Sequence, residues 1–353
     1  MQTFFEFIPS IMLFLLIAGM AGSIDPLHIR SRFTRIRGIA MGLICQFIIL
    51  PLLGLFAASV FPLDVEVAVT LLIVTTSPGG GFSGWWCSLC NADLALSIAM
   101  TTASTLFALV ALPINAFLYI KLIYGRDVEF DWVPFLIEIF VVISAVLVGM
   151  LASHHFAVHR SCINKVGQIA GVMLMLVGAF TNGGSDHPLW RNSVDWYVAV
   201  SFPCVSGLIV ALGASFLSRL SPPESVTVAI ECCYQNTGLA LTIALAAFPR
   251  DQVGGAAGVP VFYGIIEIIL IPLLALAAWK LGWTYAPAHE NVCVALIGNY
   301  QPSKSCPVGV MQLDDKSSSS LSVTGSVDRL SDERRASAIR ERSPTGGHAP
   351  SLC

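Results

Sequence analysis

The chain has 353 residues, of which 55% are hydrophobic and 12% are charged, and its mean hydropathy is +0.76. A soluble domain carries roughly a quarter charged residues, so this composition excludes a disordered chain and disfavours a soluble enzyme. The net charge of −3 is small and the apolar part has no basic cluster, which argues against a nucleic-acid partner.

Nine stretches are long and apolar enough to be membrane helices, which need about 20 residues to cross a hydrocarbon core of about 30 Å. Because unpaired backbone groups are costly in lipid, we expect helices rather than strands. The stretches are 4–23, 36–60, 65–91, 94–123, 132–153, 163–182, 194–218, 224–248 and 256–282. The first is preceded by no Lys or Arg and contains Glu6, so a retained helix is expected rather than a cleaved signal peptide. The sequence therefore predicts an all-α polytopic membrane protein.

Lys and Arg are concentrated in alternate loops, and short basic loops stay in the cytoplasm. Loops 24–35, 154–165 and 219–223 are the basic ones. We therefore expect an outside N-terminus and a cytoplasmic tail. No Arg- and Ser-rich presequence precedes the first helix, and the plasma membrane is the expected location.

The tail, residues 284–353, differs in composition from the apolar body at 1–283. It holds 14 of the 41 charged residues and is rich in serine, so it is predicted to be disordered. Within it, Arg334-Arg335-Ala336-Ser337 has the form of a basic-directed phosphorylation site. A kinase acting on Ser337 is accordingly a candidate partner.

Two of the nine segments are interrupted by residues that do not suit lipid. The third contains Pro78 and the run Gly79-Gly80-Gly81, which should unwind a helix. The eighth contains Glu231-Cys232-Cys233-Tyr234-Gln235-Asn236-Thr237-Gly238, and an ionisable group at that depth is a functional-site candidate by default. The segments lie five helices apart, which fits inverted five-helix repeats that lack the first helix. Matched breaks mark the binding site of secondary transporters, and kinks for packing are the alternative.

The first break offers ligands for an anion and for a cation. The N–H groups of Gly81, Phe82 and Ser83 begin a half-helix, and a helix N-terminus suits an anion. Carbonyls released by the unwinding, together with Glu231 and nearby hydroxyls, suit a small hard cation.

Four motifs in order resemble the sodium–bile acid symporter family (the solute carrier 10 type). They are residues 42–51 (GLICQFIILP), Pro78-Gly79-Gly80, residues 95–101 (ALSIAMT) and Glu231-x-x-x-Gln235-Asn236-Thr237. The resemblance implies two discontinuous helices that cross inside a core domain made of 36–123 and 194–282. Helices 4–23, 132–153 and 163–182 would form a panel domain.

The resemblance also implies the site residues. One sodium site would be Ser83, Ser97, Thr101 and Glu231; the other would be Gln46, Glu231 and Gln235 with the carbonyls of Cys232 and Tyr234; and Gly81, Phe82 and Asn236 would face the substrate. Sodium is the coupling ion, and no other metal or cofactor is expected. Many members have Asn where this chain has Gly84, so a side-chain oxygen of the first site is missing.

The predicted function is sodium-coupled symport of an organic anion across a lipid bilayer by alternating access. The anion could be bile-acid-like, a steroid conjugate or a small carboxylate. The sequence does not determine which of these is carried or how many sodium ions are coupled to it. A proton-coupled or uncoupled carrier of the same fold is one alternative. A non-transporting receptor or scaffold that signals through its tail is another. An enzyme is not expected, since no HExxH or G-x-S-x-G motif occurs.

Overall fold

The computed structural model describes residues 2–23, 36–124, 130–186, 188–298 and 300. In these residues the regular structure is helical, apart from one isolated antiparallel bridge between Gly79 and Gln235. The predicted all-α class is confirmed.

Six long helices run without a break in the described residues. They are α1 (Gln2–Gly22), α7 (Leu94–Tyr124), α8 (Trp132–His155), α9 (Arg160–Gly183), α10 (Val194–Leu217) and α13 (Val253–Lys280). The other predicted segments are divided into α3 (Ile36–Ile44), the π-helical turn η2 (Cys45–Ile49) and α4 (Leu50–Val60); α5 (Val65–Thr76) and α6 (Ser83–Leu89); α11 (Pro222–Cys233) and α12 (Thr237–Ala247). Short helices are η3 (Ala157–His159), η4 (Leu189–Arg191) and α14 (Val292–Ile297).

Six continuous helical stretches of the described chain are long and apolar enough to cross a membrane, namely 36–60, 94–122, 132–155, 157–183, 194–217 and 253–280. Three shorter apolar helices are Phe7–Gly22, Val65–Thr76 and Thr237–Ala247. The last two are halves of the interrupted helices, so neither reaches spanning length by itself. The protein is thus a multi-pass membrane protein, and nine crossings stay a prediction.

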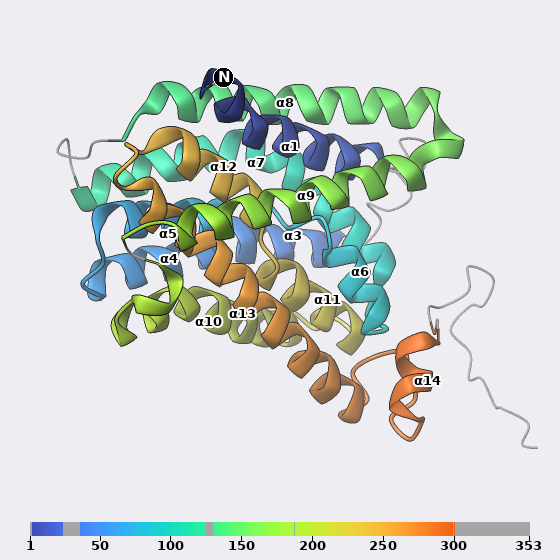
Figure 1. Cartoon of the computed structure of the whole chain (residues 1–353). Coiled ribbons are helices and arrows are strands. Elements are labelled where there is room, and N and C mark those ends of the chain that lie inside the picture. The colour runs from blue at the N-terminus through green and yellow to red at the C-terminus, as the bar shows by residue number, and fades with distance from the viewer. Residues whose placement is uncertain (1, 24–35, 125–129, 187, 299, 301–353) are drawn as a thin grey trace, which may run out of the picture. The chain divides into compact units, whose positions relative to one another are not determined.

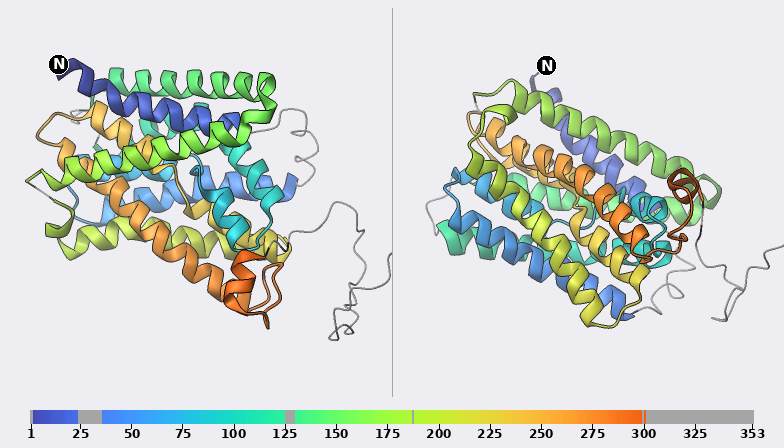
Figure 2. Two further views of the ribbon diagram at one scale, coloured as in Figure 1. Left: turned by 45° about the vertical axis from the view of Figure 1, so that its right-hand side comes forward. Right: turned by 90° about the horizontal axis from the view of Figure 1, so that it is seen from below.

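The interrupted helices lie inside the helical body, whereas α1, α8 and α9 lie along one side of it. Helix α1 packs against both α8 and α9, and Figures 1 and 2 show these three helices together. Helices α5 and α12 are buried along most of their length, and they contact each other and α13. Large apolar side chains such as Phe140 and Leu147 on α8 are exposed, as expected of a surface that faces lipid.

The structure differs from the prediction in the first part of the tail. Residues 284–298 include α14, and their backbone bonds to the turn after α6. Asn91 Nδ2 donates to the Ala295 carbonyl at 2.6 Å, and Tyr285 N donates to the Asn91 carbonyl at 2.9 Å. The packed body therefore extends past residue 283, because Tyr285 and Ala295 find partners that composition alone does not indicate. Residues 301–353, with Ser337, and loop 24–35 lie outside the described residues.

Candidate functional site

The first break separates α5 from α6 over residues 77–82. Helix α5 ends at Thr76, and Ser77 has an extended backbone with ψ of 159°. Pro78 has no N–H to continue the helical ladder, and three glycines follow it. The predicted unwinding is present, and α6 begins at Ser83.

The second break separates α11 from α12 over residues 234–236. Tyr234 N still bonds to the Ile230 carbonyl at 2.8 Å, which closes the last helical turn. Asn236 starts the next helix as an N-cap, since its Oδ1 accepts from Leu239 N at 3.0 Å. The helix thus restarts after the break through a side-chain cap, the bond between Asn236 Oδ1 and Leu239 N.

The two breaks cross and pair with each other. Gly80 N donates to the Tyr234 carbonyl at 2.8 Å, and Asn236 N donates to the Pro78 carbonyl at 2.9 Å. A Cβ on Gly80 would lie 2.6 Å from the Gln235 carbonyl oxygen, so only glycine permits this approach. The pairing satisfies backbone groups that lipid could not, which explains how irregular chain persists inside the body.

Glu231 on α11 gathers the other three residues of the predicted first sodium site. Its carboxylate accepts hydrogen bonds from Ser97 Oγ and from Thr101 Oγ1, the latter at 3.0 Å from Oε2. Thr101 Oγ1 also lies 3.2 Å from Ser83 Oγ. Glu231 is 1% exposed, and Ser83 and Ser97 are fully buried. Hydroxyl oxygens beside a buried carboxylate are suitable ligands for a hard monovalent cation.

Gln46 lies in the π-helical turn η2, and the sequence explains this turn. Pro51 lacks the N–H that would bond the Phe47 carbonyl in a regular helix. That carbonyl accepts instead from Asn115 Nδ2 at 3.1 Å, while Leu50 N bonds to the carbonyl of Cys45. Turns of this kind occur often at functional sites.

The side chain of Gln46 reaches the crossing. Its Nε2 donates to Gln235 Oε1 at 2.8 Å and to the Ser77 carbonyl at 2.9 Å. Gln46 and Glu231 also line one small recess, with Ser104. The side chains of the predicted second sodium site are thus brought together.

The two predicted carbonyl ligands of that site already accept one hydrogen bond each. The Cys232 carbonyl accepts from Gln235 Nε2 at 2.6 Å, and the Tyr234 carbonyl accepts from Gly80 N at 2.8 Å. A carbonyl oxygen has two lone pairs, so each keeps one for an ion.

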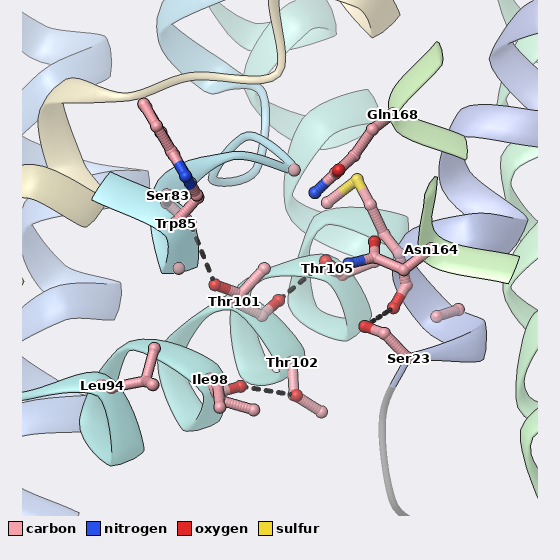
Figure 3. A pocket seen from close by; sticks show the side chains of 14 residues that line it. Ser23, Ser83, Trp85, Leu94, Ile98, Thr101, Thr102, Thr105, Asn164 and Gln168 are labelled. Atoms are coloured by element: carbon pink, nitrogen blue, oxygen red, sulfur yellow. Dashed lines mark hydrogen bonds between the residues drawn. The ribbon is translucent and has the colours of Figure 1, made fainter. Parts of the chain in front are cut away.

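A cavity of about 380 Å³ adjoins the first predicted sodium site, between α1, α9, α6 and α7. Its polar lining is Ser23, Ser83, Thr101, Thr102, Thr105, Asn164 and Gln168, and its other lining residues are Met20, Ala21, Gly81, Gly84, Trp85, Leu94 and Ile98. Figure 3 shows Ser83 and Thr101 on one side of it, and Asn164 and Gln168 on the other. The cavity therefore joins the candidate ion site to amide groups on α9.

The predicted substrate residues are divided by the structure. Gly81 lines the cavity, whereas Phe82 and Asn236 are not among its described lining residues. Asn236 is 3% exposed, and its Nδ2 has no hydrogen-bond partner among the described residues. Gly84, at the position of the missing oxygen, also lines the cavity.

Sequence reasoning missed Glu267, Asn164 and Gln168. Glu267 lies on α13, is 1% exposed, and accepts a hydrogen bond from Gln235 N at 2.6 Å through Oε1. A signal for it existed, because it is an ionisable residue inside the apolar segment 256–282, as Glu231 is inside 224–248. Asn164 and Gln168 gave no such signal, since they lie near a loop where polar residues are ordinary.

Comparison with known proteins agrees with the motifs. The model of the Sodium Bile acid symporter family matches residues 10–185. The chain is 28% identical over 279 residues to the human ileal sodium/bile acid cotransporter, covering 78% of each chain. It is 25% identical over 274 residues to the human sodium-dependent organic anion transporter, covering 76% of this chain and 72% of the relative. It is 27% identical over 263 residues to the rat hepatic sodium/bile acid cotransporter, covering 73% of this chain and 72% of the relative.

These relatives are transporters and not enzymes, and the similarity to them extends beyond the region that the family model matches. Through residues 10–185, the chain belongs to the sodium–bile acid symporter family.

Proposed function

We propose that the protein is a sodium-coupled symporter that carries an organic anion across a membrane by alternating access. The observation that carries the proposal is the buried carboxylate of Glu231, bonded by hydroxyls from α7 where the two interrupted helices cross. The names of the relatives, which include sodium-dependent cotransporters and an organic anion transporter, support the same function.

Sodium would act first. A carboxylate buried at this depth is costly unless a partner compensates its charge, and a bound cation is such a partner. One ion would take Ser83, Ser97, Thr101 and Glu231, and a second would take Gln46, Glu231 and Gln235 with the carbonyls of Cys232 and Tyr234. Their binding would fix the two crossing segments against each other.

The anion would then bind in the cavity beside the first sodium site. Asn164 and Gln168 present amide N–H groups, and Ser23 and Thr102 present hydroxyls. Trp85 and Ile98 give the cavity apolar surface for the body of the anion. A bound sodium at Ser83 and Thr101 would place a positive charge at the wall, which couples ion and anion. A cavity of this size is in the range of small-molecule sites, about 300–1,000 Å³.

The architecture assigned to this function has a panel of α1, α8 and α9 and a core of the remaining long helices, with nine crossings. The packing of α1 against α8 and α9 supports the panel. Because the cavity lies between α1 and α9 on one side and α6 and α7 on the other, movement of core against panel would open it to either face. The N-terminus would be outside, the tail in the cytoplasm, and the plasma membrane the location.

The test is thermal unfolding of the detergent-purified protein in sodium chloride and in potassium chloride. Sodium at about 100 times its dissociation constant should stabilise the native state by about 2.7 kcal/mol. Glu231→Ala should remove this difference between the salts. An uptake panel with a bile acid, a steroid sulfate and pyruvate then identifies the class of anion.

Because Glu231→Ala leaves the hydroxyls around it without their partner, a milder variant is needed. Thr101→Val removes one oxygen of the first site with little change in shape, and should weaken the sodium response. Thr181→Val is its matched control, since Thr181 Oγ1 bonds only within α9, to the Val177 carbonyl at 2.9 Å. A parent protein whose stability is equal in both salts contradicts the proposal.

Two outcomes would favour the alternatives. Uptake that follows a pH gradient and ignores sodium would indicate a proton-coupled carrier. Retention of sodium-driven uptake after deletion of residues 304–353 would support a transporter. Absence of uptake in the full chain, with loss of bound partners on the deletion, would indicate a scaffold that acts through its tail. The deletion begins at 304 because the compact unit that contains the site ends at Ser303.

A further inference from the structure

Glu267 lies at the middle of α13 and contacts the second crossing segment. It is 1% exposed, and its Oε1 accepts the backbone N–H of Gln235 at 2.6 Å. The distance is at the short end for an N–H donor. A carboxylate placed inside a membrane helix is seldom without a role.

The N–H that Glu267 binds is the one at which α11 stops. Tyr234 N still bonds four residues back, to the Ile230 carbonyl. Gln235 N would bond the Glu231 carbonyl if the helix continued, but it is directed to Glu267. Asn236 N is directed to the Pro78 carbonyl. Gln235 is therefore the first residue whose N–H leaves the helical pattern, and its bond to Glu267 leaves the Glu231 carbonyl without that helical bond.

The groups around Glu267 in the described structure do not include a positively charged side chain. Cys233 on α11, Tyr234 in the break and Tyr263 one turn earlier on α13 are its titratable neighbours, and none of them is a cation. Tyr263 is fully buried, and its hydroxyl has no hydrogen-bond partner. Within the described residues the carboxylate thus bonds to a peptide N–H of the crossing and forms no ion pair.

We propose that Glu267 is a positioning residue for the second sodium site, an inference that rests on the proposed function. Its Oε1 holds the peptide of Gln235, and this keeps the Gln235 side chain toward Gln46 and the carbonyls of residues 232 and 234 in place for the ion. Glu267 acts through Gln235 and does not itself bind sodium.

The test compares E267Q, which keeps an acceptor oxygen, with E267M, which keeps the length but has none. The measurement is stabilisation against heat as sodium chloride replaces potassium chloride in the purified full chain. For E267M the apparent dissociation constant for sodium, obtained from the rise of stability with sodium concentration, should increase about tenfold, because the hydrogen bond that fixes the Gln235 peptide is lost. E267Q should restore the response close to that of the parent.

The matched control is E138M. Glu138 is also a buried carboxylate in a membrane helix, bonded by Ser10 Oγ at 2.6 Å, but it lies on α8 away from the crossing. Whatever its effect on the melting temperature, this variant should leave the apparent dissociation constant for sodium unchanged. If E267M yields no folded protein, E267D retracts the oxygen by one methylene and should give a smaller rise in the same direction.

A sodium-responsive parent with an E267M response equal to that of E138M overturns the positioning role alone. An equal loss in E267Q and E267M also overturns it, because charge rather than the acceptor oxygen would then be responsible. A parent that ignores sodium overturns the proposed function itself.

Discussion

The break in the first interrupted helix contributes mainly backbone groups to the crossing, whereas the second interrupted helix contributes side chains as well as backbone groups. Residues 78–80 supply a carbonyl and an N–H that pair with residues 234 and 236. The second interrupted helix supplies Glu231 on α11, and Gln235 and Asn236 in the break, each of which bonds through its side chain.

The difference shows why both breaks are needed. Glycines in the first break allow another backbone to approach closely, and they carry no groups that would compete for an ion. Polar side chains in the second break then line the place where the first break passes. Three predictions test this division of roles.

The largest effect is expected from Gly80→Ala. The added Cβ would lie 2.6 Å from the Gln235 carbonyl oxygen and 2.7 Å from the Tyr234 ring. Overpacking of this kind costs about 1–3 kcal/mol, and here it also disturbs the bond from Gly80 N to the Tyr234 carbonyl. We expect lower thermal stability and loss of the sodium response.

Gly213→Ala on α10 is the control for Gly80→Ala. Nothing lies within 4 Å of a Cβ at Gly213, so this change should be neutral or should stabilise α10 by up to about 1 kcal/mol. If the two alanine variants behave alike, the close approach of the breaks is not what holds the site.

An intermediate effect in the opposite direction is expected from Gly84→Asn. This side chain would restore an oxygen near the first sodium site, and there is room for it, since the nearest atom to a Cβ at Gly84 is Ser97 Oγ at 3.8 Å. One added ligand should lower the apparent dissociation constant for sodium about fivefold, obtained from the rise of thermal stability with sodium concentration. Gly84→Ala fills the same space without an oxygen, and an equal shift in both variants would exclude a ligand effect.

The smallest effect on transport is expected from Asn91→Gly. Asn91 has a φ of 51°, which glycine adopts easily, so the change removes mainly its side-chain bonds to the Ala295 carbonyl and from Tyr300 N. The segment 285–300 should be held less tightly over the end of α6, by about 1 kcal/mol per bond. Hydrogen exchange of that segment should accelerate while sodium stabilisation is retained.

The matched control for Asn91→Gly is Asn192→Gly, whose bonds to the Pro188 and Leu189 carbonyls lie in another connection. Unchanged exchange in 285–300 for the Asn91 variant would mean that this segment is held by its other contacts and not by the Asn91 side chain.

Local signals predicted much of this molecule. Pro78 with the glycines after it marked the first break, and Glu231 within an apolar run marked the second, because each is unfavourable in a continuous membrane helix. The same local reasoning failed at 284–298, where nothing in the composition indicates the bonds from Asn91. It also passed over Glu267, although the criterion that selected Glu231 applies to it.

The sequence by itself determined which segments are apolar, where the helices break and which residue types occur at the breaks. Only the tertiary structure shows which atoms of distant segments bond to each other, as with Gln46 and Gln235, which are 189 residues apart, and Asn91 and Ala295, which are 204 apart. Helix ends depend on neighbouring residues and on backbone bonding within a few positions, so a local pattern predicts them. Contacts across the bundle depend on how whole helices pack, and that is fixed by the burial of many side chains at once.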